Sequence, residues 1–199
     1  YEQLEYIEST GTQYMPLGVD CSEGTTVELT FSHMVYGQSS AIFAAGHWNW
    51  YCFIFCTQNN YFEYCSNENK LLAKADYDPE VRYTLRTSDY NSSTKKVRAA
   101  ISSNGVEIAS MTVDNSLKYL AADKREISLF GMNNGGNKSQ CRIYAMKIWD
   151  GNKTLQRDLV PCRNEKGEWA ILNGNQTAMM FYWYQIANKK ALGQLKPSD

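Results

Sequence analysis

The sequence predicts an all-β protein built as a two-sheet antiparallel β-sandwich. Aromatic residues make up 13% of the 199 residues, while Pro occurs only 4 times. Aromatic and β-branched side chains suit the half-buried surface of a sheet. About a dozen short strand-like segments are separated by turn signals roughly every 8–12 residues, which is the spacing of a sandwich or barrel. Leu117–Ala122 is the one segment whose pattern favours a helical turn.

The clearest element is a β-hairpin near the C-terminal end. Ile143, Ala145 and Lys147 alternate with the four residues Arg142, Tyr144, Met146 and Ile148, which is the period of two that is typical of a strand. Asp150-Gly151 follows, a dipeptide that accepts the positive φ of a tight turn. The second strand runs over Thr154–Val160, and we expect it to end at Pro161, which has no N–H to give to a central ladder.

Other segments of similar length also read as strands. In chain order they are Leu4–Ser9, Gln13–Val19, Thr25–Phe31, Ala41–Gly46, Tyr51–Thr57, Tyr61–Ser66, Val81–Thr87, Val97–Ser102, Glu107–Val113 and Glu126–Phe130. Thr25–Phe31 has the most regular alternation and predicts a half-buried strand. Tyr51–Thr57 is apolar at successive positions, so we expect it to be covered on both faces.

Turn signals set the expected pairing of several strands. Asn104-Gly105 is the strongest short hairpin signal in the chain. A two-residue turn at Asn59-Asn60 would place Ile54 opposite Cys65 in an antiparallel pair. Leu71–Tyr77 shows no clear alternation and is predicted to be a connector.

Charge and hydropathy exclude some classes of partner. The chain has 20 basic and 21 acidic residues, a formal net charge of −1. No positive field is available to attract a polyanion, so nucleic acid is not an expected partner. No apolar run approaches the roughly 20 residues that span a bilayer, so membrane insertion is not expected either. The first residue is Tyr1 rather than Met, and we expect the chain to be part of a larger protein.

The cysteines are predicted to be mostly free thiols. The 6 Cys occupy positions 21, 52, 56, 65, 141 and 162. Cys52 and Cys56 would compete for Cys65 across one strand pair, and a chain of this size can build a core without disulfides. Disulfide bonds are still allowed by the even count. With no Cys-x-x-Cys and only 2 His, a structural zinc site is not expected.

Two segments at opposite ends of the chain carry a family resemblance. The opening segment LEYIESTGTQYMPLGV (residues 4–19) and the motifs IYAMKIWD (143–150) and LQRDLVPCR (155–163) resemble concanavalin A-like, laminin-G-like jelly-roll domains. Such domains are common in bacterial secreted, cell-surface and phage proteins. The resemblance implies a concanavalin A-like jelly roll, an extracellular or cell-surface location and attachment to other domains of a parent protein.

The chain departs from this family after Arg163. The family continues into a short closing strand, whose best counterpart here is Trp183–Leu192. The residues before it, Glu168–Tyr182, are predicted to form an extra C-terminal hairpin turned at Asn173-Gly174 or Asn175-Gln176. We expect one jelly-roll domain over residues 1–194 and a C-terminal tail over 195–199.

Catalytic patterns are not evident, and the protein is not expected to be an enzyme. Retaining glycoside hydrolases need two carboxyl groups about 5–5.5 Å apart. Glu63 and Glu68 would fall on opposite faces of a strand, and Pro79 lies between Asp76 and Glu80. A glycoside-active enzyme is therefore the third hypothesis.

A cluster of aromatic and amide side chains indicates carbohydrate binding. His47, Trp48, Asn49 and Trp50 follow Gly46 at the start of an aromatic strand. A sugar presents a C–H face to an aromatic ring and hydroxyl groups to nearby amides, so this combination suits a glycan. The alternative is that Trp48 and Trp50 lie on one face and pack into the core.

Two further residues complete the candidate carbohydrate-binding set. Trp169 belongs to an aromatic group in the inserted hairpin, and Asn134 lies in a loop rich in Asn and Gly. Half of the aromatic group is expected to face the core, because neighbouring strand residues point in opposite directions. The loop could equally be a simple hairpin tip.

The sequence therefore predicts a non-catalytic carbohydrate-binding module of a larger bacterial extracellular protein. Its ligand would be a poly- or oligosaccharide held by aromatic stacking and amide hydrogen bonds. The alternative is a structural or protein-binding domain of a phage or cell-surface adhesin. Calcium often supports concanavalin A-like folds, so the resemblance leaves room for a structural calcium ion. The acids Asp20, Asp114 and Asp150 show no ligand spacing.

Overall fold

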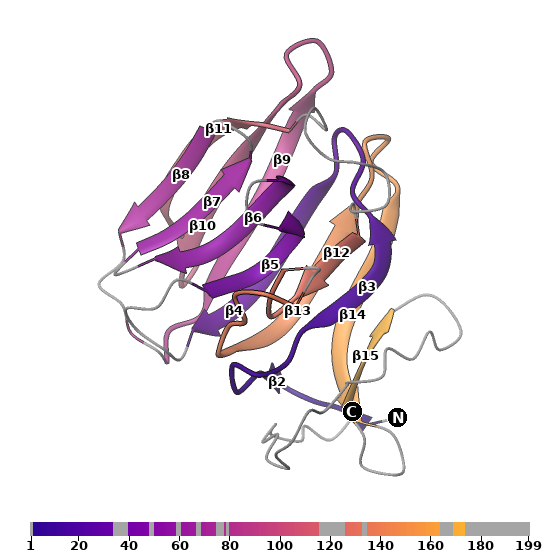
Figure 1. Cartoon of the computed structure of the whole chain (residues 1–199). Helices are drawn as coiled ribbons and strands as arrows, with labels where there is room; N and C mark the ends of the chain where they lie inside the picture. The colour runs from indigo at the N-terminus through magenta and orange to yellow at the C-terminus, as the bar shows by residue number, and fades with distance from the viewer. Residues whose placement is uncertain are drawn as a thin grey trace.

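A computed structural model describes the fold over most of the chain. The described residues are 2–33, 40–47, 50–58, 61–66, 69–74, 78, 80–115, 126–132, 135–163 and 169–173. Within these ranges the regular structure is entirely β, in two antiparallel sheets that lie one over the other (Figure 1). The predicted two-sheet antiparallel β-sandwich is confirmed.

The larger sheet has nine strands in the described part of the chain, with the order β1-β14-β13-β4-β9-β10-β11. β2 pairs with β13 and β15 pairs with β14, off this path. The strands are β1 (Glu2–Gln3), β2 (Ile7–Glu8), β4 (Thr26–His33), β9 (Tyr83–Asn91), β10 (Lys96–Ser103), β11 (Val106–Asp114), β13 (Cys141–Trp149), β14 (Leu155–Arg163) and β15 (Trp169–Asn173).

The smaller sheet has six strands in the described part of the chain, with the order β3-β12-β5-β6-β7-β8. The strands are β3 (Met15–Asp20), β5 (Ser40–His47), β6 (Trp50–Gln58), β7 (Tyr61–Ser66), β8 (Asn69–Lys74) and β12 (Glu126–Leu129). β12 comes late in the sequence but pairs with both β3 and β5. This antiparallel pairing brings the loop before β3 and the loop after β12 to the same end of the two strands.

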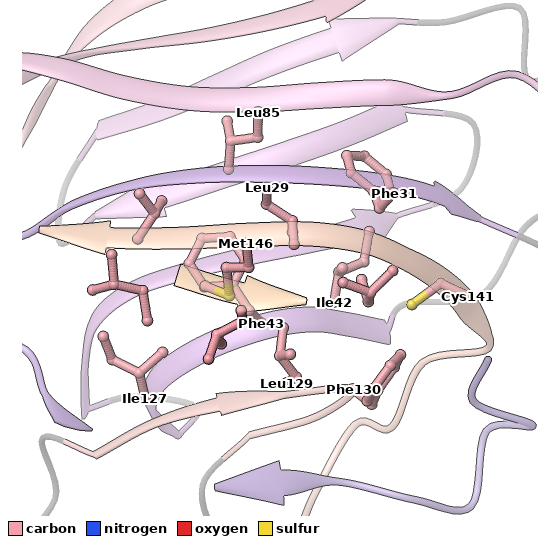
Figure 2. Close-up of a cluster of buried hydrophobic side chains, with 14 of the residues drawn as sticks. Leu29, Phe31, Ile42, Phe43, Leu85, Ile127, Leu129, Phe130, Cys141 and Met146 are labelled. Atoms are coloured by element: carbon pink, nitrogen blue, oxygen red, sulfur yellow. The ribbon is translucent and has the colours of Figure 1, made fainter. Parts of the chain in front are cut away.

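One continuous hydrophobic core joins the two sheets. In β4, Val27, Leu29 and Phe31 are buried and alternate with partly exposed polar residues, as the sequence predicts. Phe43 of β5 and Leu129 of β12 belong to the same buried cluster from the opposite sheet. Figure 2 shows side chains of β4 and β13 meeting those of β5 and β12.

The closing hairpin is confirmed, but its turn differs from the prediction. Trp149 pairs with Leu155, so five residues connect the strands and the second strand begins one residue later than predicted. The positive φ belongs to Lys153 (φ 64) and not to Gly151. The Asp150 carboxylate accepts hydrogen bonds from the backbone N–H groups of Asn152 and Thr154, each at 2.9 Å, and this side chain shapes the turn.

Gly151 is needed for a close backbone contact. A Cβ on Gly151 would lie 2.1 Å from the carbonyl oxygen of Glu23. The turn between β13 and β14 therefore packs directly against the loop that precedes β4. This contact is made between residues distant in sequence, so the Asp-Gly dipeptide alone could not reveal it.

We expect Gly151→Ala to destabilise the protein by about 1–3 kcal/mol, because the two loops must move apart to admit the new methyl group. Asn152→Ala is the matched control in the same turn, since Asn152 is exposed and should change stability by less than about 0.5 kcal/mol. Urea unfolding of both variants measures the difference. Equal stabilities would show that the loops separate at no cost.

The prediction that the second hairpin strand ends at Pro161 is wrong. β14 continues to Arg163 and pairs with β15 on one side and β1 on the other. The carbonyl of Pro161 accepts a hydrogen bond from the Leu4 N–H at 2.9 Å. Pro lacks only the donor, so its acceptor still joins the strand to the N-terminal segment.

The prediction of a connector at Leu71–Tyr77 is also wrong for residues 71–74. Asn69–Lys74 forms β8, which pairs with β7 from Ser66↔Asn69 to Tyr61↔Lys74. Three consecutive apolar residues hide the alternation that would have predicted a strand. The pairing is fixed by the neighbouring strand and not by the local pattern.

Several smaller predictions have mixed outcomes. Asn104-Gly105 forms its hairpin turn with φ values of 50° and 76°, and Ile54 does lie opposite Cys65. The single strand predicted over Leu4–Ser9 is interrupted, with only Ile7–Glu8 regular. The strand predicted to end at Thr87 extends to Asn91.

The predicted extra C-terminal hairpin is described in its first half. Trp169–Asn173 forms β15, which pairs with β14 at the end of the larger sheet. The predicted helical turn at 117–122, the closing strand at 183–192 and the tail at 195–199 lie outside the described residues.

Candidate functional site

The main predicted site lies where β5 ends and β6 begins. His47 and Trp50 are register partners at this end of the smaller sheet. Gly46 precedes them with φ 115 and at a register shift, a conformation that favours Gly over residues with a Cβ. Trp48 and Asn49 lie outside the described residues. The paired strands thus fix the residues on both sides of the predicted binding pair.

Trp169 is not brought to this position. Trp169 begins β15 and pairs with Arg163 in the larger sheet. Asn134 lies outside the described residues, but the loop on either side of it adjoins Ala41, at the opposite end of β5. Six residue steps separate Ala41 from His47, about 20 Å at the rise of a strand.

A surface that the sequence analysis missed lies beside Ala41. Tyr14 is 37% exposed, and it contacts the glycine-rich loop after β12. A Cβ on Gly135 would lie 3.2 Å from the Cε1 atom of the Tyr14 ring, and one on Gly131 would lie 3.2 Å from the Tyr14 Cβ. The sequence offered one signal, an aromatic residue directly after the polar stretch of residues 9–13. The structure adds that Gln13 and Met15 are buried while Tyr14 between them faces outward.

We call this region the Tyr14 surface. It consists of Tyr14, Gly135, Asn137, Lys138 and Gln140. The last three side chains are half-buried. Within the described part of the chain, neither they nor the Tyr14 hydroxyl have a hydrogen-bond or ion-pair partner. The Tyr14 surface therefore combines an exposed ring with unused donors and acceptors.

Backbone hydrogen bonds hold the loop under the Tyr14 ring. The Met132 N–H donates to the Gly136 carbonyl at 2.9 Å, and the Gly135 N–H donates to the Met132 carbonyl at 2.8 Å. The Ala41 N–H donates to the Asn137 carbonyl at 2.7 Å, which ties the loop to β5. A loop bonded at both ends presents its side chains in a fixed arrangement.

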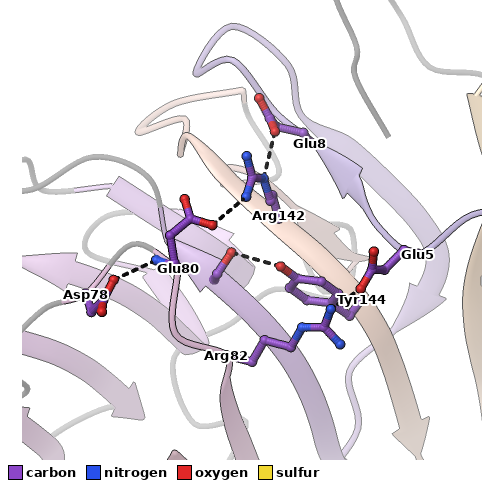
Figure 3. Close-up of polar contacts among 8 residues, drawn as sticks. Glu5, Glu8, Asp78, Glu80, Arg82, Arg142 and Tyr144 are labelled. Carbon is purple, nitrogen blue, oxygen red and sulfur yellow. Dashed lines mark hydrogen bonds and ion pairs between the residues drawn. The ribbon is translucent and has the colours of Figure 1, made fainter. Parts of the chain in front are cut away.

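A separate cluster of charged and aromatic residues covers part of the larger sheet (Figure 3). Arg142 pairs with Glu8 at 2.9 Å and with Glu80 at 3.4 Å. Arg82 pairs with Glu5 and lies 4.0 Å over the centre of the Tyr144 ring.

This charged cluster is structural in character. The hydrogen bond that Arg142 donates to the Glu8 carboxylate is the main cause that raises the pKa of Arg142. Both arginines already have carboxylate partners. The positive charges of both guanidinium groups are therefore already paired with carboxylates. The cluster fastens the N-terminal segment onto β13 and β9.

Residues considered for catalysis or metal binding do not form a site in the described part of the chain. Glu63 is buried in β7, and Glu80 is exposed and paired with Arg142. The Asp150 carboxylate accepts the hydrogen bonds that shape its turn. Among the described residues no group of three His, Cys, Asp or Glu side chains could hold a metal ion. Likewise, no helix in the described ranges is long and apolar enough to cross a membrane.

The chain matches no protein-family model. It also matches no curated protein. Among solved structures, its β-sandwich is similar to the CBM40 of the Ruminococcus gnavus IT-sialidase bound to alpha2,3 sialyllactose, a carbohydrate-binding module (TM-score 0.52, 18% identity, 73% of this chain and 89% of that chain).

Two further solved structures resemble the chain. A second structure of the same CBM40 gives a TM-score of 0.52 at 16% identity, over 73% of this chain and 90% of that chain. A candidate carbohydrate-binding protein from Bacteroides ovatus gives a TM-score of 0.51 at 13% identity, over 88% of this chain and 54% of that chain. Identities this low establish a shared fold and nothing more specific.

Proposed function

We propose that this protein is a non-catalytic carbohydrate-binding module of a larger bacterial extracellular protein. The observation that carries the proposal is the β5–β6 end, where the partners His47 and Trp50 flank Trp48 and Asn49. Loops and strand ends on a rigid sandwich are common positions for binding residues. The solved structures with this fold include carbohydrate-binding modules, which supports the proposed ligand class by analogy of fold.

In the proposed mode of binding, Trp48 forms the floor of the glycan site. Its ring would stack on the C–H face of a sugar, with Trp50 beside it. Asn49 and His47 would hydrogen-bond to sugar hydroxyls. Trp169 belongs to the larger sheet, so it would contact only an extended saccharide. Asn134 remains part of the proposed set through its amide.

The wider assignment is part of the same proposal. The resemblance at both ends of the chain supports a concanavalin A-like jelly roll spanning residues 1–194, with further domains of a parent protein as neighbours. It also supports an extracellular or cell-surface location. A structural calcium ion would be detected by a rise in melting temperature on calcium addition that a chelator reverses.

Trp48→Ala should weaken glycan binding at least tenfold and change the melting temperature little. Stacking contributes about 0.5–1.5 kcal/mol beyond burial, and apolar contact adds roughly 2.5 kcal/mol per 100 Å² before ordering costs. We therefore expect an affinity of about μM to mM for the unmodified protein.

A glycan array that includes alpha2,3 sialyllactose identifies the ligand. Calorimetric titration then compares the glycan affinity of the unmodified protein with that of Trp48→Ala and Ile108→Ala. Ile108 lies on β11, 41% exposed, so its variant controls for loss of a surface apolar side chain. Unchanged affinity together with a large loss of stability would make Trp48 a core residue and would contradict the proposed site.

One observation supports the alternative, a structural or protein-binding domain. Val106, Ile108 and Met111 are exposed on β11, at the end of the larger sheet, and exposed apolar side chains on such a strand suit contact with another protein. A silent glycan array combined with binding of a phage or cell-surface protein would support this alternative. Release of reducing sugar from a bound polysaccharide would instead indicate an enzyme.

A further inference from the structure

We propose that the Tyr14 surface is a second carbohydrate-contacting site, separate from the β5–β6 end. The two regions lie at opposite ends of β5, about 20 Å apart along the strand. This inference rests on the proposed function, because it concerns where the same class of ligand is held. The ligand would be a saccharide long enough to present a second sugar ring.

The chemistry of the Tyr14 surface matches a hydroxyl-rich ring. Tyr14 is a 37% exposed residue with an aromatic ring, the same chemistry proposed for Trp48. The amides of Asn137 and Gln140 both donate and accept hydrogen bonds, and the Lys138 amine donates. A sugar hydroxyl can do both, so each of these side chains has a complementary partner on a saccharide.

Glycines allow the ring to lie directly on the loop. Gly135 has φ 74, and its missing Cβ leaves room for the ring carbon 3.2 Å from that position. The loop hydrogen bonds that involve Met132 and Asn137 hold the backbone in place before any ligand arrives. A pre-organised surface loses less conformational entropy on binding, which favours affinity.

The loop begins with a residue in the left-handed region of backbone space. Phe130 has φ 62 although it carries a bulky side chain, and that side chain is fully buried. Ser128 Oγ donates to the Gly131 carbonyl at 2.8 Å and helps to hold this geometry. Non-glycine residues in the left-handed region are costly and cluster at functional sites. Here the strained residue begins the loop that carries the Tyr14 surface.

Nuclear magnetic resonance titration of the unmodified protein tests the proposal. The probe is the oligosaccharide with the strongest signal on the glycan array. We expect chemical-shift changes in two groups of backbone amides, one at residues 135–140 and one around Gly46 and Trp50. Changes confined to Gly46 and Trp50 would overturn the second site and leave the proposed function intact. A protein that binds no glycan at all would overturn both.

Variants of Tyr14 provide a matched test. Tyr14→Ala should weaken binding at residues 135–140 about tenfold, because the stacking face is lost. Tyr14→Phe keeps that face and should stay within about twofold of the unmodified protein. Binding around Gly46 and Trp50 should be unchanged in both variants. If Tyr14→Ala binds as well as Tyr14→Phe at residues 135–140, Tyr14 only supports the loop and the proposal is wrong.

Discussion

Replacing Phe31 with alanine should lower the free energy of unfolding by about 3–5 kcal/mol, the usual cost of removing a buried phenylalanine ring. Phe31 lies in the centre of β4 and is fully buried. Its ring meets Phe62 edge to face at 5.3 Å between centroids, and Phe62 meets Tyr83 at 4.8 Å. Because Phe62 belongs to the smaller sheet, the cavity would open between the two sheets.

Chemical unfolding in urea measures this effect. Phe31→Leu is the companion variant, since it keeps most of the volume but loses the aromatic contacts, and it should cost less than Phe31→Ala. Val106→Ala, at a position 66% exposed on β11, should change stability by no more than about 0.5 kcal/mol. A loss of less than 1 kcal/mol in Phe31→Ala would mean that the aromatic group does not hold the sheets together.

The strands that the sequence predicted best are those with one buried face. In β4, burial of Val27, Leu29 and Phe31 produces a period of two that can be read without any knowledge of neighbours. Asn104-Gly105 is equally direct, because its turn needs two residues that tolerate positive φ. Local chemistry determines both features.

The features that sequence reasoning missed depend on partners outside the local pattern. β8 forms by pairing with β7, the strand just before it, although its own residues do not alternate. Gly151 is constrained by the carbonyl of Glu23. The carbonyl of Pro161 accepts a hydrogen bond from Leu4. Glu23 and Leu4 are more than a hundred residues from their partners, so composition and period could not supply them.

The candidate site also divides into residues that local sequence indicated and residues that only the folded structure brings together. Aromatic and amide composition drew attention to Trp48 and Asn49, and the pairing of His47 with Trp50 supports a position at the end of two strands. Tyr14 was missed because the residues near it in the sequence do not show which distant side chains it lies beside. Its neighbours come from a loop more than a hundred residues away, which β12 brings beside β3.

Raising the pH above 9 should destabilise the protein in part through Cys141. Its side chain is fully buried in the core, and burial raises the pKa of the thiol from 9.0 to about 12. The contact with Ser139 Oγ at 3.4 Å opposes this rise but does not cancel it. In the folded protein the thiol therefore stays protonated where the unfolded chain would already form the thiolate.

The direction of the effect follows from proton binding. Between pH 9 and about 12 the folded state binds more protons at Cys141 than the unfolded state, so stability falls as pH rises. Each pH unit corresponds to about 1.4 kcal/mol, which gives a loss of about 2 kcal/mol at pH 10.5. The contribution is fully present below pH 9, where the thiol is protonated in both states.

Comparison of the unmodified protein with Cys141→Ala isolates this contribution. The variant should be less stable at pH 8, because it leaves a small cavity, but its stability should fall less steeply between pH 8.5 and 10.5. Urea unfolding at several pH values gives the slope of stability against pH for both proteins. Other groups also titrate in this range, such as Tyr6, whose pKa is raised by burial. These groups contribute equally to both proteins and cancel in the comparison. Parallel slopes would contradict the prediction, because they would show that the Cys141 thiol ionises equally easily in the folded and unfolded states.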